Sequence, residues 1–95
     1  MKLTMFGSFK DVACYSDGTY KVDNVSWKRD NEGNFHGYIV ENHGNTFMKC
    51  IIPSRLEKEK DLQGNLWVEG ELKTEIARGI GLINQYFLVH VIERM

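Results

Sequence analysis

The chain has 95 residues, 42% of them hydrophobic, which is enough for one small core, so we expect a single domain over residues 1–95. An aromatic content of 12% argues against a disordered chain, and the absence of any apolar run of eighteen residues argues against a transmembrane segment. The net charge of −1 disfavours duplex DNA-binding proteins, which are usually basic.

The first half of the chain alternates between strand-like segments and polar turns. Asp17-Gly18 supplies the positive φ that a tight hairpin turn needs, and Gly7 is a plausible bulge in the first strand. Further polar turns fall at residues 29–34 and 41–45. The predicted strands are residues 3–9, with a possible continuation to residue 15, then residues 20–28, 35–40 and 46–52.

The second half of the chain begins with a predicted helix. Pro53 ends the preceding strand, and Ser54 with Glu57 matches a capping box for a short helix over residues 55–62. Only two residues of that helix are apolar, so we expect it to plug one end of a barrel. Two strands follow, residues 66–74 and 85–92, joined by a glycine-containing loop over residues 75–84. The last strand is almost continuously apolar, which predicts burial on both faces.

This order of elements predicts the fold class. A strand, a helix, and then two strands joined by a long loop is how an OB barrel ends. We therefore expect an all-β, five-stranded OB-fold barrel with one short helix between strands 3 and 4. Such barrels mostly bind single-stranded nucleic acid or oligosaccharide on one open face.

The chain resembles bacterial and phage single-stranded DNA-binding proteins with one OB fold. Residues 62–74 carry the strongest similarity, with a leucine, a Gly turn and then the Val-x-Gly-x-Leu strand of Val68, Gly70 and Leu72. Residues 3–9, 16–19, 47–52 and 86–92 are similar to the family's opening strand, Gly-Thr turn, third strand and closing strand. The acidic C-terminal tail typical of the family is absent, which favours a minimal binder, such as a phage or plasmid protein or a relative of the primosomal replication protein.

Aromatic residues next to cations are the candidate binding residues. Trp67 lies on the polar face of its strand, where it could stack a base, although packing under the helix or in a subunit interface is an alternative. Trp27 precedes Lys28 and Arg29, a sequence that suits stacking or cation–π contact and equally suits core packing of the tryptophan.

Further candidates come from the central strands and the last loop. Phe35 and Tyr38 lie on opposite faces of one strand, and we prefer Tyr38 as the ligand-facing residue. Phe47 and Lys49 share a face. An aromatic side chain beside a cation suits a groove that follows a nucleic-acid backbone, although a core phenylalanine beside a solvated lysine is as plausible. Lys73 flanks the last loop, and Arg78 lies in it. In an OB fold such a loop can clamp the ligand, although a loop of solvated residues is an alternative.

No motif in the chain indicates catalysis, so we expect a protein that is not an enzyme and that needs no cofactor or metal. Cys14 and Cys50 fit no metal-ligand spacing and are expected to be free thiols. His36 and His43 likewise lack such spacing, and His90 is expected in the core.

The sequence therefore predicts non-catalytic, largely sequence-independent binding of single-stranded DNA in replication, recombination or repair, with RNA as a possible ligand. An alternative is a protein-interaction module on the same fold, such as a replication-restart partner or a phage protein that acts on a host protein. The exposed edges of a small barrel predict a homodimer or homotetramer. The polar N-terminus does not resemble a signal peptide, so we expect a cytoplasmic protein without membrane contact.

Overall fold

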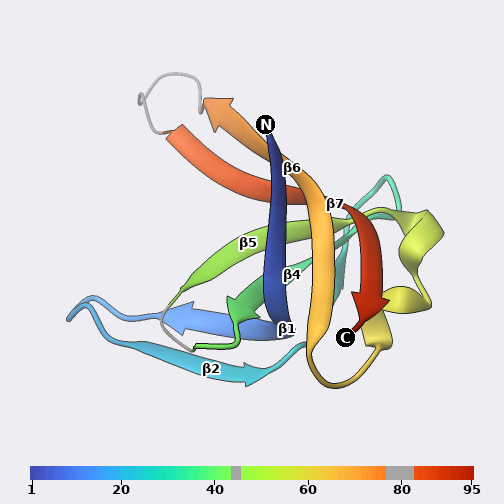
Figure 1. Cartoon of the computed structure of the whole chain (residues 1–95). Helices are drawn as coiled ribbons and strands as arrows, with labels where there is room; N and C mark the ends of the chain where they lie inside the picture. Colours follow the sequence, from blue (N-terminus) through green and yellow to red (C-terminus); the bar gives the residue numbers. More distant parts are fainter. Residues whose placement is uncertain (44–45, 77–82) are drawn as a thin grey trace.

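Seven β-strands make up most of the computed structural model, which describes residues 1–43, 46–76 and 83–95 (Figure 1). The prediction of an all-β protein is confirmed. The strands are β1 (Lys2–Cys14), β2 (Tyr20–Asn24), β3 (Lys28–Arg29), β4 (Phe35–Glu41), β5 (Phe47–Ile52), β6 (Leu66–Ile76) and β7 (Ile83–Arg94).

The ladders of hydrogen bonds between strands return to the strand where they begin. β1 pairs antiparallel with β4, and β4 pairs antiparallel with β5. β5 runs parallel to β7, and β6 pairs antiparallel with both β7 and β1. β2 lies outside this ring on the C-terminal half of β1, and β3 lies outside it on the start of β4. The long β1 therefore serves both the ring and an additional hairpin.

The sheet contains seven strands rather than the predicted five, in part because the segment predicted as one strand over residues 20–28 is broken. Between β2 and β3, Val25 and Trp27 turn toward the core, whereas every residue of β2 is exposed. The backbone N–H of Ser26 donates to the Oδ2 atom of Asp11 at 2.9 Å instead of to a neighbouring strand. The side chain of Asp11 thus takes the place of a backbone partner at Ser26, and the segment is divided into β2 and β3.

The predicted helix over residues 55–62 is wrong, because two 3₁₀ turns, η1 (Ser54–Leu56) and η2 (Glu59–Asp61), take its place. Pro53, rather than Ser54, is the N-terminal cap of η1, and no side-chain hydrogen bond caps this turn. With Leu56 and Leu62 as its only apolar residues, the segment lacks the stripe that holds an α-helix against a core. No α-helix occurs in the described ranges. Leu56 is nevertheless buried in the core, and Leu62 packs against it.

The core lies inside the ring of paired strands, because side chains alternate between the two faces of a strand. On β6, Leu66 and Val68 are fully buried while Trp67 is only half-buried, as the sequence pattern predicts. The fully buried side chains are Ile39, Cys50, Ile52, Leu66, Val68, Phe87 and Val89.

β7 is not buried on both faces, contrary to the prediction. Phe87 and Val89 are fully buried, but Leu88 between them is only half-buried. The register between β6 and β7 shifts by one residue, so that Glu69 pairs with Val91 and the next residue of β6 pairs with Val89. His90 is the extra residue of this bulge, and its side chain is 43% exposed rather than in the core.

The helical segments that the structure describes are too short to cross a lipid bilayer.

Candidate nucleic-acid interface

β4 presents two polar aromatic side chains on the outer surface of the sheet. Phe35 and Ile39 are buried, so the alternation of the strand places His36 and Tyr38 on the opposite face. Both of these outward residues are half-buried. On β5 the same alternation buries Cys50 and directs its neighbour Lys49 outward.

The register between strands places Tyr38 between two lysines. Tyr38 lies opposite Lys49 on β5 and opposite Lys10 on β1. Directly opposed residues have Cβ atoms about 4.5–5.5 Å apart, so these three side chains form one row across the sheet. In the neighbouring row, Lys28 on β3 lies opposite His36. We call Lys10, Tyr38 and Lys49 the Tyr38 row.

Aromatic rings continue the surface beyond Tyr38. The ring of Phe47 lies 6.2 Å from that of Tyr38 and 5.1 Å from that of Tyr20 on β2, measured between centroids. Tyr20 is exposed and Phe47 is half-buried. The three rings form an aromatic tract that joins the β1–β2 hairpin to the outer face of β5.

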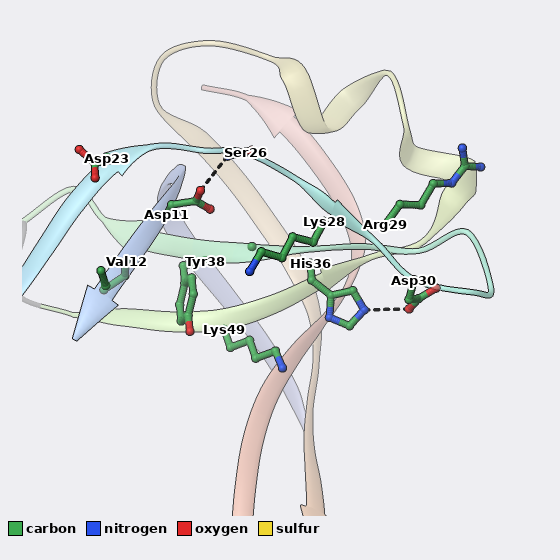
Figure 2. Close-up of a pocket in the computed structure, with 12 residues that line it drawn as sticks. Asp11, Val12, Asp23, Ser26, Lys28, Arg29, Asp30, His36, Tyr38 and Lys49 are labelled. Atoms are coloured by element: carbon green, nitrogen blue, oxygen red, sulfur yellow. Dashed lines mark hydrogen bonds and ion pairs between the residues drawn. The ribbon is translucent and has the colours of Figure 1, made fainter. Parts of the chain in front are cut away.

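A groove of about 600 Å³ runs between the β1–β2 hairpin and the face that carries Tyr38. Lys28, His36, Tyr38 and Lys49 line it from the sheet, while Asp11 and residues of the hairpin line it from the other side (Figure 2). A groove of this size with a half-buried ring on its wall and cations around it can hold part of an extended ligand.

The acidic residues of the groove already have partners in the structure. Asp11 accepts the backbone N–H of Ser26, and Asp23 lies 3.7 Å from the ammonium of Lys21. By contrast, Lys28 and Lys49 form no ion pair with any residue that the structure describes. Their charges are therefore available to an anionic ligand, although the net charge of the whole chain is −1.

Asp30 and His36 form a pair at one end of the groove. The Nε2 atom of His36 lies 2.7 Å from the Oδ2 atom of Asp30. The other carboxylate oxygen accepts the backbone N–H groups of Glu32 and Asn34 at 2.9 and 3.0 Å. The hydrogen bond from His36, assisted by these two backbone donors, holds the pKa of Asp30 below its usual value. Asp30 is thus a fixed, ionised acceptor for the imidazole.

Five of the nine predicted binding residues meet at this groove. Lys28, Arg29, Tyr38 and Lys49 line it, and Phe47 contacts Tyr38. The guanidinium of Arg29 lies 5.4 Å from the ring centroid of Phe35.

Trp27 lies on the core side rather than in the groove. Its ring packs edge-to-face against Phe9 at 5.3 Å between centroids and lies directly over Gly37. Its Nε1 atom is buried and has no hydrogen-bond partner among the described residues. Of the two interpretations left open by the sequence, the structure therefore favours core packing.

The predicted site residues of β6 lie elsewhere. In the ring of strands, β6 is separated from β4 by β1 and from β5 by β7. Trp67 is half-buried opposite Phe6 of β1, and Lys73 pairs with Glu71 at 2.8 Å. Arg78 and most of the last loop lie outside the described residues, as do positions 44–45 of the predicted turn.

Sequence reasoning missed Lys10, His36 and Tyr20 as members of this surface. A period of two along residues 35–40 could have placed His36 beside Tyr38. Lys10 and Tyr20 were not recoverable in the same way, because only pairing between distant strands places Lys10 opposite Tyr38, and only the fold brings the ring of Tyr20 against that of Phe47.

Neither cysteine lines the groove. Both are free thiols; Cys14 is exposed, and Cys50 is buried. Burial raises the pKa of the Cys50 thiol far above its usual value, because a thiolate would be desolvated there. Cys50 therefore acts as a small apolar core residue.

No protein-family model matches the chain, and no curated protein matches it significantly.

Proposed function

We propose that the protein binds single-stranded DNA on the outer face of β4 and β5, without catalysis and without strong sequence preference. The observation that carries the proposal is the Tyr38 row, in which a half-buried ring lies between two lysines that have no acidic partner in the described structure. A base can stack on an aromatic ring whatever its identity, while flanking ammonium groups contact the phosphates on either side.

The order of the paired strands supports the same proposal. We infer that β1, β4, β5, β7 and β6 are the five strands of an OB-type barrel, with β2 and β3 as an insertion between its first two strands. OB barrels bind oligonucleotides on the face of their second and third strands and with the loop after the first strand. In this chain those parts are β4, β5 and the β1–β2 hairpin, and all three border the groove together with β3.

An interaction module remains the second candidate, because another surface of the molecule is aromatic and acidic. Phe6 is 48% exposed and lies opposite Trp67, and Glu69 follows on the same face of β6. Such a surface repels phosphates and suits a protein partner or a second copy of this chain.

A titration of fluorescein-labelled oligo(dT), followed by anisotropy, tests the proposal. We expect Tyr38→Ala to weaken binding by about 1–3 kcal/mol, which is roughly 5- to 150-fold in Kd, because a stacking surface is lost. Trp67→Ala is the matched control: the groove proposal expects unchanged affinity, whereas the expectation from sequence alone is a loss. Absence of binding at micromolar wild-type protein would favour the interaction module instead.

A further inference from the structure

His36 has one ring nitrogen committed to Asp30 and the other directed away from it. An ionised carboxylate can only accept a hydrogen bond, so Nε2, at 2.7 Å from Asp30, carries a proton. In a neutral imidazole the Nδ1 atom is then an acceptor, and in an imidazolium it becomes a donor. Figure 2 shows this second nitrogen on the side of the ring that faces Lys49.

The charged groups around the imidazole divide into an acidic and a basic side. Asp30, from the turn before β4, is the acid in contact with the ring. Lys28 lies opposite His36 on β3, and Lys49 reaches the groove from β5. The guanidinium of Arg29 lies over Phe35, away from the imidazole (Figure 2). Asp11 and Asp23 line the groove from the side of the hairpin. A phosphate held by Lys28 and Lys49 would therefore lie near the open side of the imidazole.

We propose that His36 is a phosphate-binding residue of the groove that binds only as an imidazolium, so that affinity for single strands rises as the pH falls. This inference rests on the proposed function and adds a specific contact to it. Asp30 is a positioning residue, because it orients the ring and fixes which nitrogen faces the ligand.

The sign of the effect follows from the two protonation states. In the neutral imidazole, the open nitrogen presents a lone pair, which repels a phosphate oxygen. In the imidazolium, the added proton makes the same nitrogen a charged donor, and the groove gains one positive charge. Because imidazoles change charge between about pH 5 and 8, this is the range in which affinity should change.

The test measures the affinity of the whole chain for oligo(dT) at pH 5.5 and pH 8, over a series of salt concentrations. Thymine does not take up a proton in this range, so the ligand keeps its charge. We expect binding on the order of fivefold tighter at pH 5.5, as for one partly exposed ionic contact. The plot of log K against log salt should also steepen by roughly 0.7, as for one more phosphate contact to a single strand.

Three variants identify the residue responsible. His36→Gln keeps a donor for Asp30 and should remove the pH dependence. His90→Gln, on the β7 bulge, should retain the pH dependence of the wild type. Lys28→Met should reduce the salt slope by roughly 0.7 at both pH values, because a lysine stays charged throughout.

The outcomes separate this inference from the proposed function. Binding that is equal at both pH values, or a pH dependence that survives in His36→Gln, overturns the role of His36 and leaves strand binding intact. Absence of binding at every pH overturns the proposed function, and the inference fails with it.

Discussion

Position 37 of β4 requires a glycine, because the ring of Trp27 lies directly against it. A Cβ atom at this position would come within 2.7 Å of the Trp27 ring, closer than atoms of two side chains approach. The glycine thus lets the tryptophan close one end of the core beneath the groove. Packing on the core face of β4 therefore determines that residue 37 is a glycine, although the outer face of the same strand carries Tyr38.

We expect Gly37→Ala to destabilise the protein by about 1–3 kcal/mol, as overpacking of a filled site does. Urea unfolding measures the change. Adding Trp27→Leu should relieve the clash, so the double variant should lose less stability than the sum of the two single changes. A strictly additive pair would show that the ring and the glycine do not interact.

The strands differ in how many partners support them. β6 and β7 pair along nearly their full lengths, from Leu66 opposite Arg94 to Ile76 opposite Ile83. β2 pairs only with the end of β1 and has no buried residue, and β3 contributes two residues beside β4. The hairpin that borders the groove is therefore the less supported element, which suits a wall that adapts to a ligand.

Hydrogen exchange should reveal this difference in the free protein. Paired amides of β6 and β7 should exchange slowly, near the rate set by global unfolding, and amides of β2 should exchange faster by local opening. Mass spectrometry of peptides from each strand measures both rates. Equal protection of β2 and β6 would contradict this view of the hairpin.

A single core ties the whole molecule together. Phe87 is fully buried among residues from several strands, and its ring approaches Gly70 of the neighbouring β6. The opposite surface of the same strand is far less covered, since Leu88 is only half-buried. Removal of the buried ring should thus affect all strands at once.

We expect Phe87→Ala to cost about 3–5 kcal/mol of unfolding free energy, a large part of the roughly 5–15 kcal/mol that a domain has. Thermal unfolding followed by circular dichroism measures the loss. Leu88→Ala is the control on the outer face and should cost clearly less. Similar losses for both changes would mean that β7 is buried on both sides after all.

Alternation along single strands explains what could be predicted about the site. The period of two placed Phe47 and Lys49 together and separated Tyr38 from Phe35, because those relations depend only on neighbouring residues. The same reasoning could not choose between stacking and packing for Trp27. That choice depends on Gly37, ten residues away and in contact only after folding.

The predicted helix shows a second limit. Ser54 and Glu57 match a capping pattern, yet two apolar residues in eight give such a helix almost nothing to bury, and short turns deliver Leu56 to the core instead. The capping pattern is a local signal, and it was outweighed by how residues 54–62 pack against the core.

By itself, the sequence determined that this protein is built from strands, where most of them lie and which side chains share a face, because these properties repeat every two residues. Only the tertiary structure decided that Lys10, Tyr38 and Lys49 form one row and that Trp67 belongs to another surface. The reason is that the register and order of strands depend on pairings between segments far apart in the chain, which no local pattern encodes.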